Sequence, residues 1–254
     1  MTVALIARNT FREASRDRVV AGVVIAGMIA ILGTQLLRSL ALGEGFRLTI
    51  DLGLTTISVL GLLIVLLVGT NLVAKEIERR TIYNLLSRPI GRPAYLVGKW
   101  LGLSGTLWVV AGSLAMTLWV VLAVRGHFAV GPVVLQAAYL AGLELTVVTA
   151  LAVLFSALST PVMSALYTLG FYMVGQWSWD LREFARQFPA TLGWSMEMIA
   201  NIVPNLPVFN MRSLAAHGEP AAFYHLALAT LYALVYSGCV LALAAAAFES
   251  RDFK

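Results

Sequence analysis

Apolar residues dominate the chain in long runs that short polar segments separate. A hydrocarbon core about 30 Å thick needs roughly 20 helical residues to cross it, and six runs approach or exceed that length. They lie near residues 19–37, 54–74, 100–124, 133–158, 160–177 and 223–248. The pattern therefore predicts an all-α polytopic membrane protein with six transmembrane helices, in a single transmembrane domain that covers residues 1–254.

A further helix is expected before the first span. Val3, Ala7, Phe11 and Ala14 recur at helical spacing, and charged residues cover the other side of the same stretch. This pattern is typical of an amphipathic helix that lies in the membrane interface. The alternative is a short helical extension of the first span.

Composition supports the membrane class. Hydrophobic residues make up 59% of the chain and charged residues 12%, whereas a soluble domain is about half apolar and a quarter charged. The lone cysteine, Cys239, lies in the last run and is expected to be a small core residue.

The basic residues are divided unequally between the two predicted faces. Residues 8–18, 75–99 and 251–254 carry twelve Lys and Arg, and the remaining loops carry six. The positive-inside rule then predicts that both termini are cytoplasmic. Because the cations are divided among membrane-flanking loops, we do not expect nucleic-acid binding despite the net charge of +5.

The most polar stretch, residues 75–99, separates the second and third runs. Residues 75–87 suit a helix in which Glu76 and Arg80 form a favourable i,i+4 pair. Pro89 disfavours helix at the residue before it, so the helix ends there and a new one starts near Pro93. A helix, a corner and a return to the membrane indicate a docking surface for a partner; a plain solvated loop is the alternative.

The same stretch carries a motif, E-x-E-R-x-T-I-x-x-L-L-S-x-P-I-x-R-x-x-Y-L-x-G-K, which runs from Glu76 to Lys99. With PNLPVFN at residues 204–210 and the tail at 248–253, it resembles the permease subunits of ABC-2 type transporters. Permeases of this family serve copper-site maturation and the export of drugs and lipids. The resemblance implies a bacterial inner membrane location and a homodimer or heterodimer of six-span subunits, bound to two copies of an ABC ATPase.

In that family the helix after span 2 is a coupling helix that sits in a groove of the ATPase. The resemblance makes seven residues the candidates for ATPase contact: Glu76, Glu78, Arg79, Thr81, Asn84, Leu85 and Arg88. ATP would be bound and hydrolysed by the partner, so we expect no cofactor on this chain and no enzymatic activity of its own. A phosphate-binding loop is absent: Gly91 and Gly98 are separated by six residues instead of four, and Trp100 stands where a hydroxyl must bind Mg²⁺.

Other chemistry has little support in the sequence. Ser104 lies in a G-x-S-G pattern like that of intramembrane serine proteases, but the histidines lie at the opposite face or in an external loop. Gly102 and Gly105, with Gly112 and Ser113, are better explained by close helix packing. Three scattered histidines and one cysteine form no metal-ligand cluster. Met196, Met198 and Met211 are more typical of adaptable apolar filling than of copper ligation. We expect no catalytic and no metal site.

Polar residues inside the spans are the default functional candidates. Glu144 falls near the middle of the fourth span and would line a cavity, take part in proton coupling, or form an interhelical hydrogen bond. Gln176 and Trp177 fall at the predicted external end of the fifth span, as part of an aromatic belt or of a lateral exit. Pro204 interrupts the longest external loop, 178–222, which would gate an exit or simply cap the bundle.

The expected function is therefore the movement of a substrate by alternating access, driven by a separate ATPase. A pathway that is mostly apolar favours export of a hydrophobic or lipid-like cargo. Two alternatives remain open at this stage: a proton- or ion-coupled secondary transporter that uses Glu144, and a membrane anchor subunit of a maturation complex.

Overall fold

The computed structural model describes residues 2–38, 44–71, 91–185 and 190–249. This part of the chain is almost entirely helical and contains no strand, which confirms the predicted all-α class. In chain order the elements are α1 (Thr2–Ser15), α2 (Arg18–Arg38), α3 (Gly45–Ile64), the π-helical turn η1 (Val65–Gly69), α6 (Arg92–Val124), η2 (Phe128–Val130), α7 (Gly131–Leu158), α8 (Pro161–Gln176), α9 (Ser178–Ala185), α10 (Ala190–Ile202), η3 (Leu206–Phe209), α11 (Arg212–Ala216) and α12 (Phe223–Glu249).

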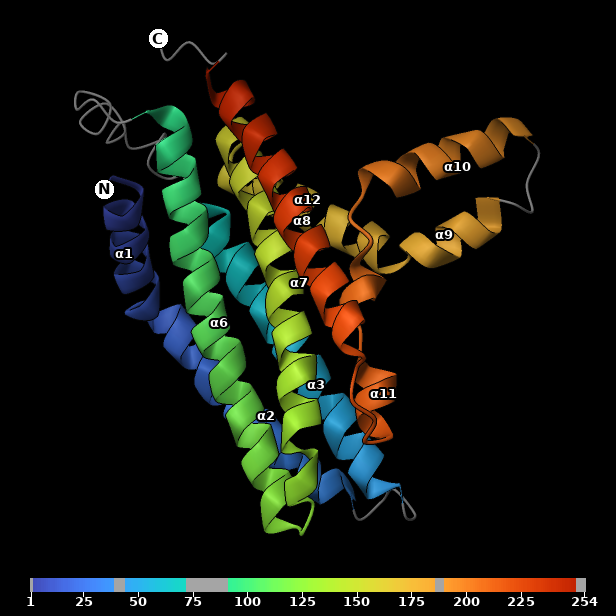
Figure 1. The fold of residues 1–254 in the computed structure, drawn as a ribbon. Helices are drawn as coiled ribbons and strands as arrows, with labels where there is room; N and C mark the ends of the chain where they lie inside the picture. Colours follow the sequence, from blue (N-terminus) through green and yellow to red (C-terminus); the bar gives the residue numbers. More distant parts are fainter. Residues whose placement is uncertain (1, 39–43, 72–90, 186–189, 250–254) are drawn as a thin grey trace.

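The long helices run side by side as one bundle (Figure 1). The starts of α1 and α6 and the end of α12 lie at the same end, which we call the N-terminal end of the bundle. The turn between α6 and α7 and the start of α3 lie at the other end, which we call the α6–α7 end.

Five helical stretches of the described residues are long and apolar enough to cross a membrane: Arg18–Leu37, Gly45–Gly69, Pro93–Val124, Phe128–Leu158 and Phe223–Phe248. The fifth predicted span, 160–177, corresponds to α8, which has only 16 residues. At 1.5 Å per residue it is about 24 Å long, short of the roughly 30 Å hydrocarbon core. The count of six full spans stays a prediction.

The second span begins earlier than predicted. α3 starts at Gly45, not near residue 54, and so includes Arg47 and Asp51. A span predicted from hydropathy alone starts after such charged residues, because they lower the average hydropathy of the segment. The helix continues through them, and both side chains line a polar pocket, described below.

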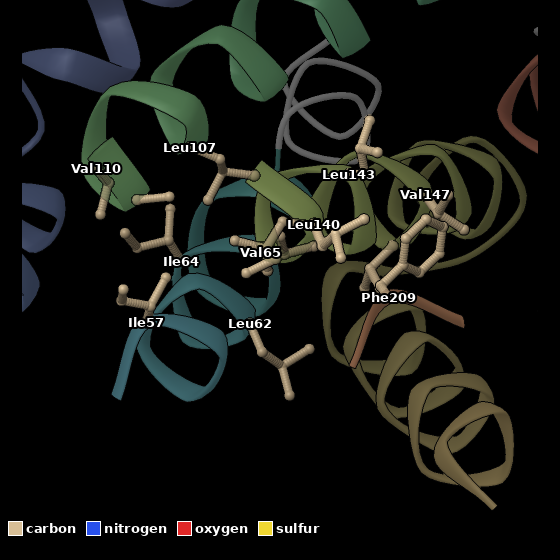
Figure 2. Close-up of a cluster of buried hydrophobic side chains, with 14 of the residues drawn as sticks. Ile57, Leu62, Ile64, Val65, Leu107, Val110, Leu140, Leu143, Val147 and Phe209 are labelled. Carbon is tan, nitrogen blue, oxygen red and sulfur yellow. The ribbon is translucent and has the colours of Figure 1, made fainter. Parts of the chain in front are cut away.

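Helix α7 is the centre of the bundle. Of its 28 residues, 21 are buried, which suits a helix that is apolar on every side. Figure 2 shows part of the core around it, with Phe209 of η3 packed beside α7. The other labelled side chains come from α3, η1, α6 and α7: Ile57, Leu62, Ile64, Val65, Leu107, Val110, Leu140, Leu143 and Val147.

Hydrogen bonds from tryptophan join α6 to α7. Trp108 Nε1 donates to Thr146 Oγ1 over 3.1 Å, and Trp100 Nε1 donates to the Thr146 carbonyl over 3.1 Å. Gly142 allows this approach, because a Cβ there would lie 3.0 Å from the Trp108 ring. The two longest helices are therefore fixed in register by one threonine.

Helix α1 packs along α6 through a row of glycines. A Cβ on Gly98 would lie 2.7 Å from the Ile6 side chain, and one on Gly102 would lie 2.5 Å from Thr10 Cβ. Small residues at such spacing let helix backbones approach closely, so the predicted packing role of Gly102 is confirmed. Gly112 was expected to pack in the same way, but it is exposed and no atom lies within 4 Å of a Cβ there.

After α8 the chain leaves the bundle and returns to it. Helices α9 and α10 form a hairpin that projects sideways (Figure 1), and Arg182 Nη2 donates to the Ala200 carbonyl between them over 3.3 Å. Residues 203–211 then run back against the bundle with Leu206, Phe209 and Met211 buried.

The structure adds to one prediction about this C-terminal region and contradicts another. The 204–210 segment, predicted as part of an external loop that gates an exit or caps the bundle, buries Leu206 and Phe209 in the core. Irregular backbone is tolerated at membrane depth only where protein buries it. Cys239 was expected in the core, but it is exposed on the outside of α12.

Candidate functional site

A buried carboxyl group lies at the middle of the bundle. Glu144 is the fourteenth of the 28 residues of α7, and only 4% of it is exposed. A carboxyl group buried there needs a polar partner, because losing its hydration is costly. Gln176 provides that partner by donating a hydrogen bond from Nε2 to Glu144 Oε1.

This contact places the end of α8 at the level of the middle of α7. Gln176 is the last residue of α8, and Glu144 lies about 21 Å from either end of α7 at 1.5 Å per residue. Gln176 and Trp177 end the helix that the sequence predicted as the fifth span, but this end lies at the level of the middle of α7; that it faces outward stays a prediction. α8 stops part-way because its C-cap, Trp177, leads directly into α9, which turns out of the bundle.

A small cavity adjoins Glu144. Its volume is about 10 Å³, roughly the room that one water molecule needs. Ser58 of α3 and Arg212 of α11 line the same cavity, so an arginine faces the space beside the buried carboxyl group.

A larger pocket of about 740 Å³ opens beside α3, α9 and α11. Its polar and aromatic lining includes Arg47, Asp51, Gln176, Trp179, Asp180 and Arg212. Gln176 and Arg212 thus belong both to this pocket and to the surroundings of Glu144. Polar groups therefore extend from the α6–α7 end of the bundle to its middle.

Helix α3 supplies one wall of this polar path. Arg47 and Asp51 line the large pocket, and Leu54 and Ser58 line the small cavity, which lies nearer the middle of the bundle. Their spacing of four, three and four residues puts all four on one face of the helix. The spacing is visible in the sequence, but only the structure shows that this face of α3 borders the pocket and the cavity.

The buried segment after α10 packs against α8 beside the site. A Cβ on Gly175 would lie 2.9 Å from the Pro204 carbonyl oxygen and 3.0 Å from the Leu206 side chain. Asn205 is held on both sides: its backbone N–H donates to Tyr232 Oη over 2.8 Å, and Ser178 Oγ donates to its Oδ1 over 2.9 Å. Pro204 therefore lies next to the end of α8, one residue from the Gln176 contact.

Comparison with protein families identifies the chain. A model of the ABC-2 family transporter proteins matches residues 4–253. The chain belongs to the ABC-2 transporter family. It is a membrane-spanning permease subunit that works with an ABC ATPase. A comparison with curated proteins gave no match.

The structure brings together three of the four residues that the sequence singled out within the membrane region of this ABC-2 permease. Glu144 and Gln176 are hydrogen-bonded, and Pro204 packs one residue away at Gly175. Trp177 points elsewhere: 61% of it is exposed, and the neighbouring tryptophan that lines the pocket is Trp179.

The seven residues proposed for ATPase contact lie outside the described residues of the permease. The flanking structure is described. Thr70 N–H bonds to the Val65 carbonyl over 3.2 Å in a π-helical turn, and Ser156 Oγ donates to the Thr70 carbonyl over 2.8 Å. Among the described residues of the permease, no group of three or more His, Cys, Asp and Glu could hold a metal ion.

Proposed function

We propose that this ABC-2 permease exports a hydrophobic or lipid-like molecule across a bacterial inner membrane. It would act as a dimer with a second permease subunit, driven by two copies of the ATPase. The N-terminal end of the bundle would face the cytoplasm, because residues 8–18 and the 75–99 block carry most of the basic residues. The α6–α7 end would then face outward.

The polar path from the outward pocket to Glu144 carries this proposal. Charged and polar groups inside a membrane bundle are costly and generally mark a substrate or ion route. Here Asp51, Arg212 and Gln176 lead from the pocket to a carboxyl group at the middle of the most buried helix. We interpret the pocket as the outward half of the transport route. The Glu144–Gln176 contact would close it toward the middle of the bundle.

The connection to the ATPase would run through α3. The charged block at 75–99 follows α3 in the chain, so a movement of the block would pull on Gly69 and Thr70 first. π-helical turns such as Val65–Gly69 occur frequently at functional sites. Because α3 also carries Arg47 and Asp51, such a movement would reach the pocket directly.

Co-purification tests the ATPase partnership. The detergent-solubilised permease would be isolated from its native cells as wild type and as the Glu78→Arg/Arg79→Glu double variant. We expect the ATPase with the wild type and its loss from the variant. A matched control is Arg12→Glu/Glu13→Arg, which exchanges the same two charges at exposed positions of α1 and should retain the ATPase.

Two other functions predict different results in the same experiment. A proton- or ion-coupled secondary transporter needs no ATPase, so none would appear with either protein, and Glu144→Gln would abolish uptake or efflux driven by an ion gradient. A membrane anchor would bind its partner through residues 75–99. Its activity would survive Asp51→Asn and Glu144→Gln.

A further inference from the structure

The outward pocket has an uneven balance of charge. Arg47 forms an ion pair with Glu44, with Nη1 2.9 Å from Oε2. Arg212 lines the small cavity that it shares with Glu144. Each arginine of the pocket therefore has an acidic residue of its own nearby.

The two aspartates of the pocket have no such compensation. Asp51 and Asp180 are both exposed, and neither forms an ion pair within the part of the chain that the structure describes. They come from different helices, α3 and α9, and line the same space of about 740 Å³. The lining itself holds two arginines and two aspartates, and Glu44 and Glu144 lie beside the arginines, so acidic residues outnumber basic ones four to two in and around the pocket.

An aromatic ring stands next to this surplus charge. Trp179 precedes Asp180 in α9 and also lines the pocket, with 58% of its surface exposed. The face of a tryptophan ring attracts a cation, and more strongly where water is excluded. Carboxylates combined with an accessible indole suit an organic cation better than an anion or a hydrated metal ion.

The helix that carries Trp179 and Asp180 leads into a hairpin with exposed apolar side chains. The α9–α10 hairpin begins at the pocket wall and exposes Phe184, Trp194, Met198 and Ile202. A ligand with its charge in the pocket could therefore rest its apolar body on this hairpin.

We propose that the pocket binds the positively charged group of an amphiphilic organic cation, through Asp51, Asp180 and Trp179. This assignment names the substrate class for the same site and rests on the proposed export function for the direction of transport. Arg212 lines both this pocket and the small cavity beside Glu144, where the Glu144 carboxyl group lies next to it. The specificity of the pocket is for positive charge on a hydrophobic body.

A pair of probes with matched shape tests the charge preference. Tetraphenylphosphonium and tetraphenylborate have the same four-ring body and opposite charge. Each would be added to the purified permease, without ATPase, in nanodiscs of phosphatidylcholine, and binding to empty nanodiscs would be subtracted. We expect saturable binding of the phosphonium and at least tenfold weaker specific binding of the borate.

Isosteric variants test the residues. Asp51→Asn/Asp180→Asn should weaken phosphonium binding at least tenfold, and Trp179→Leu should weaken it severalfold. Glu219→Gln removes an exposed carboxylate of the 217–222 connection, outside the pocket, and should leave binding unchanged. Arg212→Gln should not weaken it. Only variants whose melting temperature equals that of the wild type are compared for binding. If the double variant melts at a lower temperature, the single Asp51→Asn and Asp180→Asn variants are used in its place.

Three results would overturn the inference: tighter specific binding of the borate, phosphonium binding that the aspartate variants leave unchanged, or no specific binding of either probe. Because binding is measured on the permease alone, the outcome is independent of the ATPase test. Phosphonium binding without a co-purifying ATPase would leave the pocket assignment standing and refute the coupling. A co-purifying ATPase without phosphonium binding would refute the pocket assignment alone.

Discussion

Gln176 Nε2 donates a hydrogen bond to Glu144 Oε1 and so joins the last residue of α8 to the middle of α7. The contact gives the buried carboxyl group a hydrogen-bond partner, and Tyr172 and Arg212 also lie within interaction distance of it. Gln176 also lines the larger pocket, so the contact joins that pocket to the buried carboxyl group.

Removal of the Glu144 side chain should destabilise the protein. Glu144→Ala leaves the Gln176 amide without its acceptor, which costs about 1–3 kcal/mol for a buried group. For a chain of this size that corresponds to a melting temperature lower by several degrees. Glu144→Gln keeps an acceptor oxygen and should lose less. Tryptophan fluorescence during heating in detergent measures both, and equal losses would mean that the charge of Glu144 matters more than this hydrogen bond.

The contact between α8 and the 204–210 segment depends on the absence of a side chain at Gly175. Gly175→Ala puts a Cβ 2.9 Å from the Pro204 carbonyl oxygen, and because that neighbour is backbone, the segment has to shift. Overpacking of this kind costs about 1–3 kcal/mol. We expect a lower melting temperature and weaker substrate stimulation of the partner ATPase.

Gly170→Ala is the matched control for this change, because it lies in the same helix and its Cβ would meet no atom within 4 Å. Alanine is the better helix former by up to about 1 kcal/mol, so the control should be as stable as the wild type or more so. A Gly175→Ala protein that behaves like the control would refute the close packing of Pro204 on α8.

Tyr232 of α12 supports the same segment from the other side. Tyr232→Phe removes the acceptor of the Asn205 N–H and keeps the ring. A fully buried donor that is left unsatisfied costs about 1–3 kcal/mol, but this hydrogen bond is part-buried. An interhelical hydrogen bond in a membrane protein contributes about 0.6 kcal/mol on average, so a loss near 1 kcal/mol is expected. Chemical denaturation in mixed micelles measures it. Tyr224→Phe in the same helix is the control, since 69% of Tyr224 is exposed, and a similar loss there would argue against a specific role for Tyr232.

Docking of α1 on α6 should depend on Gly102. Gly102→Ala puts a Cβ 2.6 Å from the Ala7 carbonyl oxygen, which forces the two backbones apart. Trypsin can cleave α1 at Arg8, Arg12 and Arg16 once this helix opens. We expect cleavage several times faster than in the wild type, whereas Gly112→Ala in the exposed part of α6 should leave the rate unchanged. Equal rates in both variants would mean that α1 is held by other contacts.

Local patterns determined much of this protein. Runs of apolar residues are enough to predict the all-α membrane class and the position of four of the long helices, because each helix must be apolar over its own length. The recurrence of Val3, Ala7 and Phe11 predicts a helix whose apolar face then packs on α6. Glu144 stands out in sequence because a charged residue inside an apolar run is rare and costly.

Only the tertiary structure decided where α8 stops and what lies beside its end. The sequence shows an apolar run up to residue 177, but the depth that the run reaches depends on how Pro204, Leu206 and α12 pack against it. The pocket likewise draws Arg47 and Asp51 from α3, Asp180 from α9 and Arg212 from α11. These residues lie up to about 165 positions apart in the chain. Hydropathy is a property of neighbouring residues along one segment, whereas a polar site inside a bundle depends on which faces of different helices meet.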